Sequence, residues 1–365
     1  MTSSEYAKHH VGLVAALVER GELPDERWRA AFQAVPRHWF VPAYYEWDTG
    51  GYRRVDGADP AQRDEWLTGI GSDRVLVTYL VDGNTASSSS QPSLMAAMLH
   101  ALEVEDGQRV LEVGTGTGWN AALLCARLGE TNVTSVDVEP ELTRSARARL
   151  VAAGYRPTVR TVDAAGELPA GPFDRLLATC GVSRVPASWL AALAPGGRML
   201  VPLGAGLARI ERTGQRAATG RFLPDPVFFM RLREPGGAPV AGRPPLPSGP
   251  GRESGLGVGA IADSDWRFLV SLVLPALVWQ YDLGEDRQPE AVRVWHGDGS
   301  VAELRKDGTV AEAGPRRLWA ELEETWRAYQ CNGRPGRERY GISIEGDGQR
   351  VWLDQPTGLG WSLTG

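Results

Sequence analysis

The fold is decided by one stretch of the sequence, Leu111-Glu112-Val113-Gly114-Thr115-Gly116-Thr117-Gly118-Trp119-Asn120. Three glycines at alternate positions let the chain turn tightly after an apolar run and let a ligand approach the backbone closely. Asp137 lies 19 residues beyond Gly118, at the end of the next apolar run. A carboxylate there can accept hydrogen bonds from both ribose hydroxyls of a cofactor that contains adenosine. The stretch therefore predicts a strand that ends at a cofactor site.

Apolar strands alternate with helical stretches on both sides of this loop. The expected strands are residues 109–113, 133–137, 159–163, 175–179 and 198–202. Such alternation predicts an α/β fold with a mostly parallel, doubly wound, Rossmann-like sheet. The first backbone amides of the helix after Gly118 would then face the polar end of the ligand.

The spacing of the glycines separates two classes of cofactor. The dinucleotide fingerprint is Gly-x-Gly-x-x-Gly, whereas this loop is Gly-x-Gly-x-Gly with Glu112 two residues before it. The latter form is typical of S-adenosylmethionine enzymes, whose product is S-adenosylhomocysteine. The alternative is a glycine turn in a sheet that holds no ligand. We therefore expect an S-adenosylmethionine-dependent methyltransferase.

Composition divides the chain into four segments. Residues 1–84 begin with helical patterns, and their acidic part, 46–82, shows little periodicity before a strand at 73–79. This acidic part is either a solvated face or a lid over the substrate. Residues 85–235 form the methyltransferase domain that binds S-adenosylmethionine, and residues 236–259 are rich in Gly and Pro, which indicates a linker.

Residues 260–365 are expected to form a smaller α+β accessory domain that recognises a peptide substrate. Leu318, Leu322 and Trp326 recur every four residues behind Gly314-Pro315, which predicts a helix. The apolar runs at 340–344 and 349–353 flank a Gly-containing turn and predict a β-hairpin.

Composition also excludes several classes of protein. The 365 residues are 42% hydrophobic with a formal charge of -6, which gives no reason to expect a nucleic-acid partner. No apolar run is long enough to span a membrane and no signal peptide is visible, so we expect a cytoplasmic protein. Three distant cysteines, and histidines without ligand spacing, predict no disulfide and no metal site. A monomer is expected.

Three further motifs resemble the protein-L-isoaspartate O-methyltransferase family. They are Val35-Pro36-Arg37-His38-Trp39-Phe40-Val41-Pro42, Ser88-Ser89-Ser90-Gln91-Pro92 and the run from Ala194 to Gly204. The resemblance covers about residues 10–235. It implies that Ser90 lies near the substrate carboxylate and that Asp163 lies near the adenine edge. The sequence departs from the family pattern at Ser88 and Ser89, where the family has Thr and Ile, and at Ala164, where it has Gly.

The resemblance and the glycine loop together give the expected site residues. Ser88, Ser89 and Ser90 are expected to be catalytic, because hydroxyl donors can orient one oxygen of a carboxylate and leave the other free to attack. The residues expected to bind the cofactor are Glu112, Gly114, Thr115, Gly116, Thr117, Gly118, Trp119, Asp137, Val138, Asp163 and Ala164. An aspartate is already ionised at neutral pH, so no general base is needed and alignment carries the catalysis.

A closer resemblance concerns the substrate. The tetraserine Ser87 to Ser90 and the segments 314–323 and 348–354 are similar to methyltransferases that accompany ATP-grasp ligases in graspetide biosynthesis. This resemblance implies that an aspartate of a modified precursor peptide is methylated and that the ester closes to a succinimide, or aspartimide. A lanthipeptide-associated enzyme, an isoaspartate repair enzyme and an inactive peptide-binding module are the alternatives. The intact Glu112, glycine loop and Asp137 argue against the inactive module.

Overall fold

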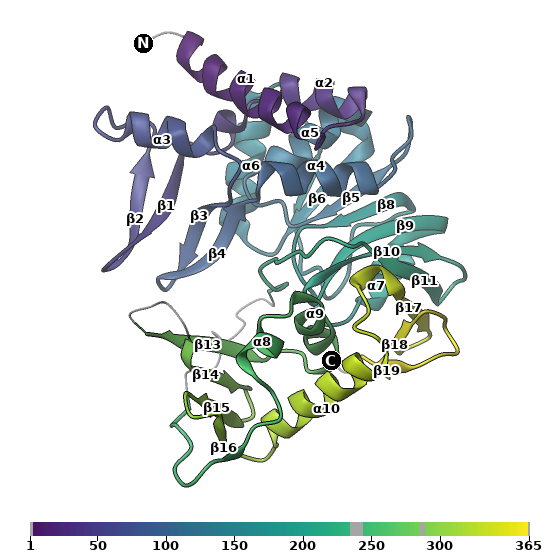
Figure 1. Ribbon diagram of the computed structural model, residues 1–365. Coiled ribbons are helices and arrows are strands. Elements are labelled where there is room, and N and C mark those ends of the chain that lie inside the picture. The colour runs from purple at the N-terminus through teal and green to yellow at the C-terminus, as the bar shows by residue number, and fades with distance from the viewer. Residues whose placement is uncertain (1–2, 234–243, 285–288, 364–365) are drawn as a thin grey trace.

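The strands form three sheets in the part of the chain that the structure, a computed structural model, describes. These residues are 3–233, 244–284 and 289–363. A ten-stranded sheet occupies the centre, a four-stranded sheet lies toward the N-terminus and a five-stranded sheet belongs to the C-terminal region (Figure 1). Of the described helices, none has the length and hydropathy that crossing a bilayer requires.

One half of the central sheet is parallel, in the order β7-β6-β5-β8-β9. Its strands are β5 (Val110–Val113), β6 (Val133–Asp137), β7 (Thr158–Thr161), β8 (Phe173–Ala178) and β9 (Leu193–Leu203). Helix α4 (Pro92–Ala101) precedes β5, and the helices between the strands are α5 (Trp119–Leu128), α6 (Pro140–Ala152) and α7 (Ala187–Ala192). Leu176 and Ala178 of β8 enter one core cluster, whereas Leu177 enters the other. Both faces of the sheet are therefore covered, which confirms the predicted doubly wound fold.

The other half of the central sheet is antiparallel. Its strands come from two segments that lie far apart in the sequence, residues 206–222 and residues 340–362. Its strands are β10 (Gly206–Arg212), β11 (Ala217–Phe222), β17 (Tyr340–Glu345), β18 (Gly348–Leu353) and β19 (Gly360–Ser362). The predicted hairpin is confirmed as β17 and β18. It pairs with β11, from Ala217 opposite Glu345 to Arg221 opposite Gly341. The expected accessory domain 260–365 is therefore not a separate body, because its last strands complete the methyltransferase sheet.

A five-stranded sheet makes up the rest of the C-terminal region. Its strands are β12 (Arg252–Glu253), β13 (Val278–Leu283), β14 (Pro289–Trp295), β15 (Val301–Arg305) and β16 (Thr309–Ala313). The helices of this region are α8 (Val258–Ile261), α9 (Ser264–Val273) and α10 (Leu318–Cys331), the last of which confirms the predicted helix. Residues 236–243 of the expected linker lie outside the described residues, and its later part supplies β12 and the start of α8.

Helix α9 joins the C-terminal sheet to the central sheet (Figure 1). Trp266 and Phe268 on this helix are fully buried, and the Phe268 ring packs edge-on against Phe222 of β11 at 4.8 Å between centroids. The Ser271 hydroxyl accepts a hydrogen bond from the Ala205 amide at 2.8 Å. One hydrophobic core therefore continues from the methyltransferase strands into the C-terminal region.

The N-terminal region holds more regular structure than the sequence analysis expected. It contains α1 (Ser3–Glu19), α2 (Glu26–Ala34), a 3-10 turn (Arg37–Trp39), β1 (Ala43–Asp48), β2 (Gly51–Asp56), α3 (Arg63–Ile70), β3 (Leu76–Val81) and β4 (Asn84–Ser89). The four strands form a sheet in the order β2-β1-β3-β4.

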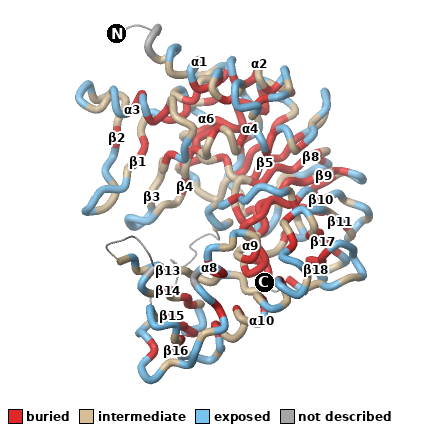
Figure 2. Tube along the Cα trace, viewed as in Figure 1, coloured by how far each residue is buried: buried red, intermediate tan, exposed pale blue. Residues whose placement is uncertain are grey.

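The prediction of an irregular acidic stretch was wrong for β1 and β2. These strands bury few side chains, chiefly Tyr44 and Val55, and rely on cross-strand pairs such as Glu46 opposite Arg53. Figure 2 shows this contrast, with buried residues along β5, β8 and β9 and mostly exposed ones on β2. A sheet with so little buried surface leaves a weak hydrophobic pattern in the sequence.

Candidate active site

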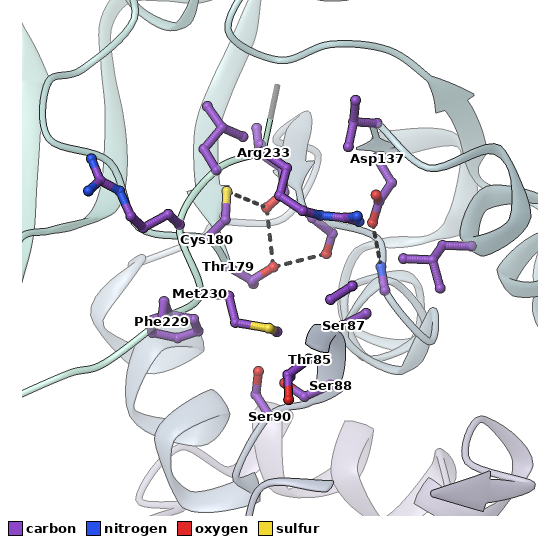
Figure 3. A pocket seen from close by; sticks show the side chains of 18 of the residues that line it. Thr85, Ser87, Ser88, Ser90, Asp137, Thr179, Cys180, Phe229, Met230 and Arg233 are labelled. Carbon is purple, nitrogen blue, oxygen red and sulfur yellow. Dashed lines mark hydrogen bonds between the residues drawn. The ribbon is translucent and has the colours of Figure 1, made fainter. Parts of the chain in front are cut away.

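A cavity lies at the carboxyl ends of the central parallel strands (Figure 3). The chain runs from β5 to β6 and β7 on one side and then to β8 and β9 on the other, so the cavity lies where the strand order reverses. It encloses about 1020 Å³, part of it open to solvent. The walls come from the end of β4, the glycine loop after β5, the end of β6, the turn after β8 and the segment 228–233. We call it the active-site pocket.

The glycine loop has the backbone that its sequence predicts. Gly114 has a φ of 102°, and a Cβ atom there would lie 2.4 Å from the Thr179 hydroxyl oxygen. Gly116 has a φ of 51°, and its amide donates a hydrogen bond to Asp137 Oδ2 at 3.0 Å. Both glycines line the active-site pocket. The absence of side chains therefore lets the loop approach β8 and present its backbone to a ligand.

Asp137 is held by the backbone at the end of β6. Its Oδ2 accepts from the Gly116 amide, and its Oδ1 accepts from the Glu139 amide at 3.1 Å. Burial raises the pKa of Asp137, while these amides act in the opposite direction. Each carboxylate oxygen keeps a lone pair for a further donor. The side chain can therefore accept two vicinal hydroxyl groups without having to be ordered first.

The structure brings only some of the predicted cofactor residues to the pocket. Gly114, Gly116, Asp137, Val138 and Ala164 line it. The predicted residues that are not among the lining residues are Glu112, Thr115, Thr117, Gly118, Trp119 and Asp163. Glu112, Thr115 and Trp119 among them are buried and form hydrogen bonds within the protein.

Three of the residues outside the lining are held by hydrogen bonds within the protein. The Thr115 hydroxyl pairs with the Ser135 hydroxyl at 2.6 Å. The Trp119 indole is buried and donates to the Val35 carbonyl at 3.0 Å. Asp163 Oδ1 accepts from the Ala165 amide at 2.9 Å.

Glu112 is fully buried beneath the glycine loop. Its carboxyl group accepts from Asn120 Nδ2 at 2.7 Å and from the Ser135 hydroxyl at 2.5 Å. Burial raises the pKa of Glu112 to about 7, against which these two hydrogen bonds act. The residue therefore carries a pH-dependent contribution to stability.

The stability of the protein should fall as pH rises through the range set by Glu112. Between its ordinary value of 4.5 and about 7, the unfolded chain has lost the Glu112 proton while the folded protein keeps it. That difference removes about 3 kcal/mol of stability over this range. In Glu112→Gln, which has no proton to lose, we expect a correspondingly smaller decrease between pH 5 and pH 8. Urea unfolding at both pH values measures this, and equal decreases in the two proteins would contradict the assignment.

The three predicted catalytic serines do not share one environment. Ser88 and Ser90 line the active-site pocket, as does Ser87, whereas Ser89 does not. The Ser89 side chain is buried and accepts a hydrogen bond from Arg37 Nε at 3.0 Å. Ser89 therefore belongs to the support of the strand, and of the three predicted serines Ser88 and Ser90 are the ones that line the pocket.

Arg37 fixes the position of the serine strand. It is almost fully buried, and its Nη2 donates to the carbonyl oxygens of Ser89 at 3.0 Å and Ser90 at 3.1 Å. The same guanidinium lies over the Trp119 ring, 5.6 Å from its centroid. Because Trp119 also bonds to Val35, residues 35–37 connect the serine strand to the start of α5. This gives the predicted N-terminal motif a structural role.

The segment 228–233 was missed by the sequence analysis. Its backbone runs beside the turn after β8, with the Gly181 amide donating to the Met230 carbonyl at 2.8 Å and the Leu232 amide to the Gly181 carbonyl at 2.7 Å. Figure 3 shows the Met230 side chain within the pocket and Arg233 extending toward Asp137. The apolar run at 227–230, followed by arginines, was the available signal, but it contains no known motif.

The residues present fit an adenosine-containing cofactor. Asp137 offers a carboxylate for ribose hydroxyls, and Val138, Leu142 and Ala164 offer an apolar surface near it for a flat base. Ser88 and Ser90 line the pocket on the side across from Asp137.

Removing the Asp137 carboxylate should weaken S-adenosylmethionine binding at least tenfold. The Asp137→Ala variant leaves two ribose hydroxyls poorly paired, and a hydrogen bond to a charged group contributes about 1.5–3 kcal/mol. Calorimetric titration with S-adenosylmethionine measures the change. Asp174→Ala is the matched control, because Asp174 lies at the opposite end of β8 and bonds to the Arg109 amide. Unchanged affinity in Asp137→Ala would overturn the cofactor assignment.

Comparisons with known proteins point to one family. The family model described as protein-L-isoaspartate(D-aspartate) O-methyltransferase (PCMT) matches residues 62–224. A protein-L-isoaspartate O-methyltransferase of Thermococcus onnurineus is 35% identical over 195 residues, covering 52% of this chain and 76% of that protein. One of Methylorubrum extorquens is also 35% identical, covering 59% of this chain and 84% of its own length.

A solved structure is similar over a longer part of the chain. It is a protein-L-isoaspartate O-methyltransferase, with a TM-score of 0.55 and 22% identity, covering 94% of this chain and 99% of that one. Because the match covers 94% of this chain, it must include residues beyond 235. The likeness in fold therefore extends beyond residue 235 into the C-terminal region.

Proposed function

The chain belongs to the protein-L-isoaspartate O-methyltransferase family, and from that premise we propose that it methylates an aspartate side-chain carboxylate in a ribosomally synthesised, modified peptide of the graspetide type. It is an S-adenosylmethionine-dependent carboxyl O-methyltransferase. The proposal concerns its acceptor. The observation that carries it is the hydroxyl-bearing end of β4, which lies across the pocket from Asp137.

The acceptor side of the pocket suits an ionised carboxylate that must remain nucleophilic. The described lining residues between 75 and 94 include no charged side chain, and Thr85, Ser88 and Ser90 supply hydroxyls there. Hydroxyl donors can orient one carboxylate oxygen, whereas a Lys or Arg pair would lower the nucleophilicity of both. S-adenosylmethionine, when bound, supplies an electrophilic methyl group. The protein's task is to align the attacking oxygen with that carbon.

The proposed product leads to a succinimide. In the methyl ester the side-chain carbonyl is more electrophilic than in the carboxylate. The backbone amide nitrogen of the following residue can then attack it, losing its proton and expelling methanol, to close a five-membered aspartimide. The resemblance of the tetraserine 87–90 and of segments 314–323 and 348–354 to graspetide methyltransferases supports a biosynthetic substrate.

Isoaspartate repair is the second candidate. The names of the relatives and the coverage of the solved structure favour it. A lanthipeptide precursor is a variant of the biosynthetic proposal, with the same chemistry on another ring system. An inactive peptide-binding module would require the pocket to have lost its function, and Asp137 with its two backbone amides argues against that.

A comparison of acceptors tests the proposal. Linear graspetide precursor, cyclised precursor and an isoaspartyl test peptide are incubated with the full chain and S-adenosylmethionine and followed by mass spectrometry. We expect the cyclised precursor to gain a methyl group and then lose methanol, because its ring has already lost much of the entropy that alignment requires. Fast methylation of the isoaspartyl peptide alone would contradict the proposal and favour isoaspartate repair as the function.

Substitution of Ser90 should slow methyl transfer without weakening cofactor binding. Losing one neutral hydrogen bond to the acceptor corresponds to roughly a three- to tenfold lower kcat. Ser93→Ala serves as control, because its hydroxyl accepts from Gln91 Nε2 at 2.9 Å and is not part of the pocket lining. Equal turnover in Ser90→Ala and Ser93→Ala would assign the serines a structural role only.

A further inference from the structure

A second cavity adjoins the active-site pocket on the C-terminal side. It lies between the segment 228–233, helix α9 and strand β13, and encloses about 1260 Å³, part of it open to solvent. Phe228, Phe229 and Arg231 line both cavities. We call it the α9 cavity. A bound peptide that leaves the active-site pocket over these three residues would enter the α9 cavity directly.

Two arginines supply the charge of the α9 cavity. Arg231 and Arg267 line it, and no acidic side chain among the described residues does. The Arg267 guanidinium is partly buried, lies 3.5 Å from the centroid of the Trp279 ring and donates to the Tyr281 hydroxyl at 2.8 Å. No described carboxylate forms an ion pair with either arginine.

The acidic groups closest in sequence to Arg267 are engaged elsewhere. Asp263 caps α9 by accepting from the amides of Asp265 and Trp266, and it also accepts from the Tyr329 hydroxyl. Asp265 forms an ion pair with Arg337. Arg267 therefore presents an uncompensated positive charge at a partly dehydrated site, where a carboxylate ligand gains more than it would in water.

An exposed aromatic side chain marks the edge between the two cavities. Phe228 is 76% exposed, although it stands beside the apolar Phe229 and Met230. Large apolar side chains exposed next to a cavity are typical of binding surfaces. Together with Trp279 and Tyr281, Phe228 gives the path an aromatic wall that can pack against peptide side chains.

We propose that the α9 cavity binds an acidic side chain of the peptide substrate, at a position flanking the residue that is methylated. This inference rests on the proposed function in that the acceptor is a peptide. The planar guanidinium of Arg267 stacks on Trp279 and leaves one of its N–H edges free to bind a carboxylate. Arg231, which lines both cavities, can bind the same carboxylate from the border between them. The overall charge of -6 disfavours acidic peptides in general, so selection for one must come from a local site such as this.

Binding of two matched probes tests the inference. The probes are fluorescein-labelled twelve-residue peptides of alternating threonine and glutamate, or threonine and glutamine, without aspartyl residues. Their affinities are measured by anisotropy at low ionic strength with the full chain. We expect the glutamate peptide to bind at least tenfold more tightly, which corresponds to one charge-assisted hydrogen bond. Because neither probe can be methylated at an aspartate, a failure of the proposed function leaves this readout unaffected.

Variants separate the α9 cavity from general surface charge. Arg267→Gln and Arg231→Gln should each remove most of the preference for the glutamate peptide. Arg160→Gln, an exposed arginine on β7, should leave it unchanged. Cofactor titration verifies that each variant is folded, and Arg231→Gln, on the surface, remains informative if Arg267→Gln is not. No preference in the wild type, or a preference that survives in both cavity variants, would overturn the inference.

Discussion

Replacing Arg37 by methionine is expected to destabilise the protein by about 3–5 kcal/mol and to abolish most methyl transfer. The guanidinium donates hydrogen bonds to the carbonyl oxygens of Ser72, Arg74, Ser89 and Ser90 and to the Ser89 hydroxyl. In Arg37→Met these buried acceptors lose their donor. Burial lowers the pKa of Arg37 to about 9, so the side chain stays charged at neutral pH. Urea unfolding and kcat per folded molecule measure the two effects.

A second buried arginine provides the control for Arg37. Arg175 in β8 donates to the carbonyl oxygens of Leu102 and Glu103, away from the active-site pocket. Arg175→Met should also lower stability but should leave kcat per folded molecule close to that of the wild type. If Arg37→Met behaved in the same way, with stability reduced and kcat retained, Arg37 would have no part in positioning the serines.

A chain that ends at Gly251 is expected not to fold. It lacks β17 to β19, which cover β11, and α9, whose Phe268 packs on Phe222. Each apolar side chain exposed in this way removes about 1.5–3 kcal/mol, and domains are stable by only about 5–15 kcal/mol. Solubility and near-ultraviolet circular dichroism measure the outcome. Co-expression of residues 252–365 as a second chain should restore soluble protein.

A soluble, cofactor-binding chain 1–251 would contradict that prediction. It would mean that the antiparallel half of the central sheet is dispensable. The role of the C-terminal region in substrate binding is therefore better tested by single substitutions such as Arg267→Gln than by truncation.

Local features were predictable from the sequence, and long-range ones were not. The glycine loop and Asp137 follow each other along one strand–helix–strand unit, so their proximity is set by local geometry. The pairing of β11 with β17 joins strands more than 100 residues apart, and nothing in either strand specifies its partner. Period-two patterns identify strands but do not determine their order in a sheet.

The site shows the same limit at the level of side chains. Ser88, Ser89 and Ser90 are identical in type, and only the structure shows that Ser89 faces Arg37 while its neighbours line the pocket. Glu112 was assigned to the cofactor on its position in the motif, whereas its full burial assigns it to the loop's support. Residues 228–233 reach the pocket through backbone hydrogen bonds with Gly181. Backbone contacts of this kind do not depend on side-chain type, so the sequence pattern does not predict them.

The pairing of β11 with β17 also constrains the order of events during synthesis. When the ribosome has released residues 110–222, the parallel strands can assemble, but β11 must wait for residues 340–345 before its free edge is covered. At about 5–20 residues per second, that interval lasts on the order of ten seconds. During that time an open strand edge is available to other chains, which favours aggregation. Slower translation of residues 250–340, or a lack of chaperones, should therefore lower the yield of active protein without altering the stability of the finished fold.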